Sequence, residues 1–229
     1  MTKNSFDIKI RTDILEFLRK MKLFKLDNYI PEDHYADSVK EISRKGAFRD
    51  IYEEICKTYS YDIMLIDGSI FQFHKENDNY RYCFMQSPKV KYSWEEYLYV
   101  NDLKEDELTE EESNLYRSCY DNDEEDSFRR VENPMYIRYD VSGEEYFVCY
   151  HPYSHLHIGL HNELRIPVSK VLTPDQFAEF SVKMTYRELW KEKYDQKIIY
   201  EFHKQVKRKC ESVDEKYWSA NDQLDLFLV

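Results

Sequence analysis

Residues 151–161 read His-Pro-Tyr-Ser-His-Leu-His-Ile-Gly-Leu-His and contain four of the seven histidines of the chain. Side chains alternate between the two faces of an extended strand, so one face of this segment is expected to carry His155, His157 and His161. The aliphatic residues between these histidines then point into a core. The segment therefore predicts a strand with one apolar face and one face of imidazole groups.

Strands of the same kind are expected on both sides of this segment. Alternating apolar residues bounded by turn residues predict them at 61–67, 69–74, 80–85, 135–140, 145–150 and 164–168. Gly68 and Gly143 mark turns that join two pairs of these strands into hairpins. Short connections of this kind favour an antiparallel sheet.

Helices are expected before, between and after the strands. Apolar residues at helical spacing predict helices over 7–22, 37–44, 48–55, 173–193 and 194–209. Capping-box patterns, in which a Ser or Thr precedes a Glu or Gln by three residues, predict helix starts at Ser93, Thr109 and Thr173. The fold class expected is α+β: a mostly antiparallel sheet with helices packed on one face and at both chain ends.

The length of 229 residues suits one domain with a sizeable core. We expect that domain to cover residues 1–210. It would comprise an N-terminal helical part to about residue 58, a sheet-containing part over 59–193 and a C-terminal helix over 194–209. Residues 211–229 are expected to form a tail.

The charge of the chain argues against direct electrostatic binding of DNA. The net charge is −12, and acidic residues are concentrated between residues 101 and 126. Such a surface repels nucleic acid, so little direct DNA binding is expected. The four glycines form neither a P-loop nor a GxGxxG motif.

The location expected from the sequence is the cytoplasm. No run reaches the roughly 18 apolar residues of a membrane span, and the N-terminus lacks the apolar stretch of a signal peptide. Five scattered cysteines without a CxxC pair are expected to be free thiols in a reducing compartment.

The histidine segment suggests acid–base chemistry that needs no metal. Two histidines can divide the roles of general base and general acid near neutral pH, so His155 and His157 are the candidate pair. Arginine is suited to holding a phosphate, and Arg138 and Arg165 are expected on neighbouring strands as an anion clamp. Further residues are expected to surround and orient these four: His151, His161, Tyr139 and Asp140. Such a set would suffice to cleave a phosphodiester.

Two alternatives use the same residues. His155, His157 and His161 could supply three nitrogen ligands to zinc, although no recognised metal-ligand spacing is present. The histidines could instead form a buried polar network that pins the sheet or binds a ligand without catalysis. Convergent histidines and arginines in an open cleft would favour chemistry, and a buried network would not.

Several motifs resemble an uncharacterised prokaryotic family known as domain of unknown function 2290. They are Tyr136-Ile-Arg-Tyr-Asp140, His151-Pro-Tyr-Ser-His-Leu-His-Ile-Gly159, Arg165-Ile-Pro-Val-Ser169 and Leu172-Thr-Pro-Asp-Gln-Phe177. The resemblance covers residues 135–190 and implies a bacterial cytoplasmic protein of about this length, with no established activity. The His-x-His strand is also similar to small toxins of toxin–antitoxin systems. That similarity implies a phage-defence or mobile-element setting, with a protein partner encoded in the same operon.

The C-terminus carries a second motif, Gln223-Leu-Asp-Leu-Phe227. It resembles the short peptide with which bacterial polymerases and repair proteins bind the replicative sliding clamp. Leu226 and Phe227 would fill an apolar pocket of the clamp, and Leu224 would add a side contact. The Gln223 amide would fix the register of the peptide by hydrogen bonds, and Asp225 is the middle residue of the motif. The competing interpretation is a strand that packs its alternate leucines on the core of this protein. The leading hypothesis is thus a protein of nucleic-acid metabolism, and the alternative is a non-enzymatic adaptor or sensor.

Overall fold

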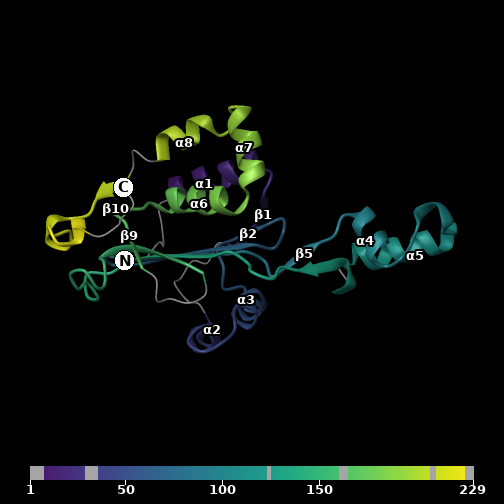
Figure 1. Ribbon diagram of the computed structural model, residues 1–229, viewed down its shortest axis with the longest axis horizontal. Helices are drawn as coiled ribbons and strands as arrows, with labels where there is room; N and C mark the ends of the chain where they lie inside the picture. The colour runs from purple at the N-terminus through teal and green to yellow at the C-terminus, as the bar shows by residue number, and fades with distance from the viewer. Residues whose placement is uncertain (1–7, 29–35, 123–124, 160–164, 207–209, 225–229) are drawn as a thin grey trace. The chain divides into compact units, whose positions relative to one another are not determined.

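The computed structural model in Figure 1 describes residues 8–28, 36–122, 125–159, 165–206 and 210–224. The chain divides into two compact units. One comprises residues 1–86 and 135–229 and is called the sheet unit below. The other, residues 87–134, is called the inserted unit, because it interrupts the sheet unit between two neighbouring strands.

An antiparallel sheet forms the centre of the sheet unit. Its seven strands, counted over the described residues, run in the order β1-β2-β3-β4-β7-β8-β9, and each pair of neighbours is antiparallel. The strands are β1 (Phe24–Asp27), β2 (Ile63–Leu65), β3 (Ile70–Glu76), β4 (Asn79–Met85), β7 (Tyr136–Val141), β8 (Ser154–Ile158) and β9 (Ile166–Pro167). The expected α+β class is thereby confirmed.

Helices cover both faces of this sheet, as Figure 1 shows. One face packs against α1 (Ile8–Lys20), α6 (Pro174–Thr185), α7 (Arg187–Asp195) and α8 (Tyr200–Val206). The other face packs against α2 (Asp37–Ile42) and α3 (Phe48–Lys57). The expectation of helices on one face did not include this second layer. This second helical layer forms because the second face of the sheet also carries apolar side chains, among them Ile70 and Met85.

The larger core depends on the alternation of aromatic residues along the central strands. Phe71 and Phe84 are directly paired on β3 and β4, and their ring centroids lie 4.9 Å apart. Phe177 of α6 meets the Phe71 ring edge to face, at 6.4 Å. Each such buried ring stabilises the fold by about 1.5–3 kcal/mol relative to an exposed one. These contacts hold α6 on the sheet.

Several local predictions can be compared directly with the structure. Gly68 has a φ of 86°, as the expected turn between β2 and β3 requires. Ser93 and Thr109 form the expected capping boxes of α4 (Trp94–Val100) and α5 (Glu110–Asp121). Thr173 forms none, because its hydroxyl donates to the nearby Asp175 carboxylate.

Three expected elements differ from those observed. The helix expected over 173–193 is divided at Tyr186 into α6 and α7, because the backbone of Tyr186 is not helical. Residues 145–150 form a turn and not a strand, closed by a single bridge between Phe147 and His151. The helix expected over 194–209 is interrupted, because Lys197 adopts a left-handed φ of 58° between α7 and α8.

The expected C-terminal tail packs on the rest of the sheet unit as far as Asp222, which is buried. β11 (Glu211–Ser212) pairs with β10 (Lys170–Val171), and the Tyr217 ring stacks on Tyr153 at 4.2 Å. Tyr217 ends the short helix η4 (Glu215–Tyr217), and the last described element is η5 (Asp222–Leu224). Residues 225–229 lie outside the described residues.

The inserted unit holds the acidic stretch of the chain. β5 (Lys89–Lys91) pairs with β6 (Phe128–Arg130), and between them lie η1 (Glu105–Glu107), η2 (Glu125–Ser127) and the two helices α4 and α5. Trp94, Tyr97 and Tyr120 form its small aromatic core. Arg117 lies 3.8 Å above the Trp94 ring.

Over the described residues, every helix is too short or too polar to cross a membrane. The five cysteines all lie within the described residues, and no disulfide joins any two of them.

Candidate functional site

Two rows of polar side chains cross the second face of the sheet, beyond the part that α2 and α3 cover. Directly paired residues of antiparallel strands point to the same face, so the strand register defines each row. One row consists of His74, Arg81, Asp140 and His155, from β3, β4, β7 and β8. The next row consists of Gln72, Cys83, Arg138 and His157, from the same four strands.

We call one group of residues on this face the polar cluster: Arg81, Arg138, Asp140, His151, His155, His157 and Arg165. The first six belong to the two rows or lie beside them. Arg165 directly precedes β9, and continuing the β8–β9 register by one residue sets it opposite His157.

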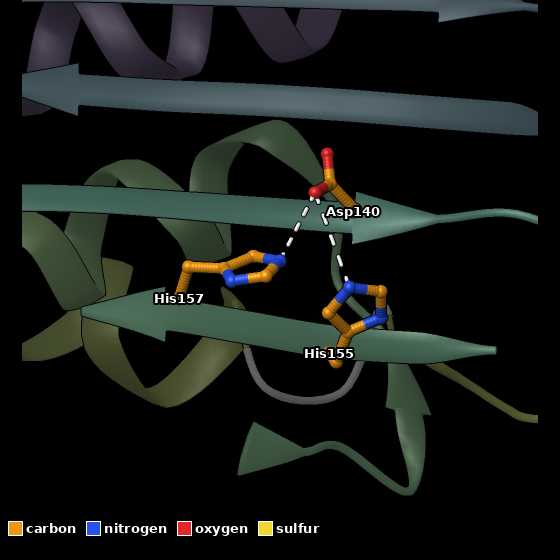
Figure 2. Close-up of side chains that lie close together, drawn as sticks. All are labelled: Asp140, His155 and His157. Atoms are coloured by element: carbon orange, nitrogen blue, oxygen red, sulfur yellow. Dashed lines mark ion pairs between the residues drawn. The ribbon is translucent and has the colours of Figure 1, made fainter. Parts of the chain in front are cut away.

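Asp140 is the centre of the polar cluster. Its Oδ1 accepts a hydrogen bond from Arg81 Nε at 3.0 Å, and its Oδ2 accepts one from Arg138 Nε at 2.7 Å. In Figure 2 both imidazole rings extend from β8 toward this carboxylate. His157 Nε2 lies 3.3 Å and His155 Nε2 lies 3.9 Å from Oδ2.

Burial alone would raise the pKa of Asp140. The adjacent His157 ring and the positive charges of Arg138 and Arg81 outweigh that effect, so the pKa is lowered well below its usual range. Asp140 is therefore an anion at every physiological pH. Its negative charge holds the two guanidinium groups on this face.

His155 is held in one orientation with one nitrogen left as a base. Its Nδ1 lies 2.7 Å from the carbonyl oxygen of Pro152 and donates its hydrogen to that oxygen. The proton of the neutral ring is therefore on Nδ1, and Nε2 keeps its lone pair toward Asp140. Burial lowers the pKa of His155 to about 4, so the ring is uncharged at neutral pH.

His157 is fully buried and lies between Asp140 and Arg138. Arg138 Nη2 is 3.0 Å from His157 Nε2, and a guanidinium can only donate. Nε2 of the neutral ring therefore accepts this hydrogen bond, and its proton is on Nδ1. Within the described residues that Nδ1 has no hydrogen-bond partner.

Two more buried nitrogens of the polar cluster share this property. Among the residues that the structure describes, neither His151 Nδ1 nor Arg165 Nε has a hydrogen-bond partner. The His151 and His155 rings are 4.9 Å apart, and burial together with the charge of Arg165 lowers the pKa of His151. A buried polar atom without a partner costs about 1–3 kcal/mol, so a ligand that reached these three nitrogens could recover part of that cost by hydrogen bonding to them.

The charges of the polar cluster favour an anion as that ligand. Two guanidinium groups, those of Arg81 and Arg138, pair with the single carboxylate of Asp140, and the charge of Arg165 acts on the neighbouring His151. Glu145 adds one carboxylate at the rim, where its Oε2 is 3.6 Å from His151 Nε2. Positive charge remains in excess at this face although the whole chain carries −12.

Asp140, His155 and His157 also form a group that could hold a metal ion. One potential ligand atom of each lies within 4.8 Å of the others. A carbonyl that orients His155, as Pro152 does, is typical of metal-binding histidines. However, the Arg138 guanidinium already contacts both His157 Nε2 and Asp140 Oδ2. A metal ion bound to these two atoms would have to displace that cation.

The structure brings together most of the site residues expected from the sequence. Arg138, Asp140, His151, His155, His157 and Arg165 all belong to the polar cluster. Tyr139 lies on the opposite face, because neighbours in a strand alternate, and its hydroxyl contacts Ser154 Oγ at 2.8 Å. His161, the third expected zinc ligand, lies outside the described residues.

Sequence reasoning missed Arg81. Its signal is a charged residue between two aromatic residues of the 80–85 strand, but the pairing of that strand with 136–141 is a tertiary feature. Arg81 is also the accessible part of the cluster, since 62% of its side chain is exposed while His155 and His157 are buried. The site is thus a buried network with one exposed arginine at its edge.

The C-terminal motif is described only at its first two residues. Gln223 and Leu224 are exposed, with 84% of Leu224 accessible. Asp225, Leu226 and Phe227 lie outside the described residues. Packing on the core, which the competing interpretation requires, is absent for Leu224.

These features define an α+β protein in which a seven-stranded antiparallel sheet, counted over the described residues, carries a buried His–Asp–Arg network. The chain belongs to the family described as "Uncharacterized conserved protein (DUF2290)", whose model matches residues 25–219. This match extends well beyond the 135–190 stretch on which the resemblance was based. No curated protein and no solved structure matches the chain.

Proposed function

We propose that the polar cluster binds a phosphate group of a nucleic-acid ligand and cleaves a phosphodiester bond without a metal. One observation carries the proposal: Arg81 and Arg138 pair with a single buried carboxylate, Arg165 acts on the adjoining His151, and three buried nitrogens of this cluster have no hydrogen-bond partner among the described residues. Phosphate oxygens accept hydrogen bonds and match arginine geometry. Arg81, Arg138 and Arg165 are the anion clamp.

The two buried histidines divide the proton transfers. His155 Nε2 takes the proton of a ribose 2′-hydroxyl, whose oxygen then attacks phosphorus. The bond from phosphorus to the leaving oxygen breaks, and that oxygen takes a proton from His157 Nδ1. This last transfer requires His157 to carry a second proton on Nε2. In that state Nε2 gives up its hydrogen bond from Arg138 and donates to Asp140 Oδ2, which lies 3.3 Å away. Arg138 stabilises the charge that develops on phosphorus oxygens.

A second candidate function is ligand sensing without turnover. The observation that favours it is the burial of both His155 and His157, which keeps the candidate acid–base pair from solvent. In this version the polar cluster binds the phosphate, and the binding alters a partner surface. The two versions share a ligand and differ in product.

The test uses the purified full chain with a short single-stranded RNA in the presence of EDTA. Cleavage that His155→Asn abolishes, with RNA binding and stability retained, supports the enzyme. The Asn amide preserves the donor to the Pro152 carbonyl but supplies no base. His203→Asn, in α8 and paired with Glu179 at 2.6 Å, is the matched control and should cleave normally.

Binding without cleavage assigns the sensor function instead. Arg81→Ala should then weaken RNA binding and lower the salt dependence by about one phosphate contact. Arg49→Ala, an exposed arginine paired with Glu53 on α3, should change neither. No binding of RNA or phosphate by the wild-type protein overturns the proposal in both versions.

We also propose that Gln223–Phe227 attaches the protein to the replicative sliding clamp. Asp222 is anchored directly before the motif: its Oδ2 accepts from Tyr146 Oη at 2.8 Å and its Oδ1 accepts from the Cys149 amide at 3.1 Å. Gln223 and Leu224 follow as exposed residues. A peptide presented from a fixed point is suited to docking, and the clamp would supply the DNA proximity that the acidic chain lacks.

A titration of the intact protein against purified clamp tests this attachment. Micromolar binding that is lost in the double variant Leu226→Ala, Phe227→Ala supports it, provided that the melting temperature is unchanged. Asn221→Ala, an exposed change just before the motif, is the control. Absence of binding, or unfolding of the double variant, overturns the attachment and leaves the phosphate-site proposal unaffected.

A further inference from the structure

The turn between β7 and β8 exposes two aromatic rings next to the polar cluster. Phe147 is 68% exposed and Tyr150 is 77% exposed, and their ring centroids are 6.3 Å apart at an interplanar angle of 87°. Val148 between them is 39% exposed. Large apolar side chains gathered on one short turn mark a contact surface more often than isolated ones do.

The backbone of this turn is firmly held. The amides of Phe147 and His151 each donate to the carbonyl oxygen of the other, at 2.9 and 2.8 Å. Cys149 adopts a left-handed φ of 59°, which non-glycine residues rarely do, and the buried Asp222 accepts its amide hydrogen. The two rings are therefore presented on a fixed support and lose little freedom when they bind a partner.

The turn leads directly into the polar cluster. Tyr150 is followed by His151, about 3.8 Å further along the backbone. The His151 ring lies 4.9 Å from that of His155, and Arg165 is close enough to lower the pKa of His151. An aromatic surface and a cationic, donor-rich site are thus neighbours on one segment. Glu144 and Glu145 precede the turn, so the attraction for an anion comes from the cluster side.

A ligand with a flat aromatic group beside a phosphate fits this arrangement. We infer that Phe147 and Tyr150 form a platform on which two bases of a single-stranded nucleic acid stack, one on each ring, while a phosphate of the same strand lies in the polar cluster. This inference rests on the proposed function and adds the substrate class to it. Every base has a π face, so recognition by stacking is tolerant of sequence.

The test measures binding of the full-length protein to three probes. They are a fluorescein-labelled five-nucleotide single-stranded RNA, an abasic ribose-phosphate chain of the same length, and inorganic phosphate. Phe147→Ala and Tyr150→Ala should each weaken RNA binding by about 10-fold, the usual scale for loss of one stacked base. Binding of the abasic chain and of phosphate should stay the same. Tyr99→Ala, an 83% exposed tyrosine of the inserted unit, is the matched control and should bind RNA normally.

The outcomes separate the two proposals. If RNA and the abasic chain bind equally and both alanine variants match the wild type, the platform is refuted while the phosphate site stands. If the wild-type protein binds none of the probes, the proposed function itself fails. Both residues are exposed, so unchanged melting temperatures of the variants should verify that their fold is intact.

Discussion

Arg138 and His157 face each other directly across β7 and β8, and Arg138 Nη2 lies 3.0 Å from His157 Nε2. The same guanidinium donates through Nε to Asp140 Oδ2 at 2.7 Å. One arginine thus links the imidazole and the carboxylate. The hydrogen bond to Nε2 leaves the proton of the neutral His157 ring on Nδ1. The guanidinium also contacts the two atoms, His157 Nε2 and Asp140 Oδ2, that a metal ion would use.

His157→Ala should lower the free energy of unfolding by about 1–3 kcal/mol, because it leaves buried donors of Arg138 without their acceptor. His157→Gln retains a side-chain amide near the Nε2 position and should recover most of that stability. Neither variant has the imidazole that donates the proton to the leaving oxygen, so both should lack cleavage. Urea unfolding and RNA cleavage measured on the pair separate the two roles. Full cleavage by a stable His157→Gln protein would falsify the acid assignment.

The pH dependence of stability should reveal the neutral state of His155. Its pKa is lowered from 6.5 to about 4 by burial, so below about pH 6.5 the unfolded chain binds a proton that the folded protein does not. Stability therefore falls as the pH drops from 6.5 toward 4, by at most about 1.4 kcal/mol per pH unit from this residue. His155→Asn should remove that contribution. Unfolding free energies at pH 5 and pH 7 provide the measurement.

The comparison with His155→Asn is necessary because Asp62 changes the pH dependence of stability in the direction opposite to that of His155. Burial raises the pKa of Asp62 to about 7, so this carboxyl favours the folded state more as the pH falls through 7. The difference between wild type and His155→Asn cancels this common effect. Equal changes in the two proteins between pH 7 and pH 5 would contradict the buried, neutral state of His155.

The amount of zinc that the protein binds should depend on whether the Arg138 guanidinium is present. The wild-type protein is expected to purify without stoichiometric zinc and to cleave RNA equally well with and without EDTA. Arg138→Ala removes the guanidinium that contacts both His157 Nε2 and Asp140 Oδ2. This variant should therefore bind zinc at least tenfold more tightly than the wild-type protein. Elemental analysis and zinc titration give the answer. About one tightly held metal per wild-type chain would overturn the metal-independent chemistry.

Tyr139 should prove structural. Its hydroxyl accepts from the Leu172 amide at 2.9 Å and contacts Ser154 Oγ at 2.8 Å, on the face opposite the polar cluster. Tyr139→Phe leaves a buried amide without its acceptor, and should cost about 1–3 kcal/mol of stability. RNA binding and cleavage by the folded variant should be unchanged. A selective loss of cleavage at unchanged stability would return Tyr139 to the site.

Alternation along single strands was accessible from the sequence alone. The pattern of 155–158 predicts which side chains share a face, because a strand has a period of two whatever its neighbours are. The same local rule accounts for the capping boxes at Ser93 and Thr109, whose bonds join residues three apart. It placed His155 and His157 on one face of their strand. Applied to 136–141, the same rule separates Tyr139 from Arg138 and Asp140, although all three were expected at the site from the sequence.

Tertiary structure determined how deeply the side chains of that face are buried and which residues they contact. Arg81 reaches Asp140 across 59 residues of sequence, because β4 pairs with β7 after the inserted unit, and no local pattern encodes that pairing. The apolar stretch 145–150 favours a strand by propensity, yet it forms an exposed turn whose Tyr146 hydroxyl and Cys149 amide donate to the distant Asp222. Local sequence thus determined the direction of side chains, whereas burial, charge partners and the turn depended on contacts between residues far apart in the chain.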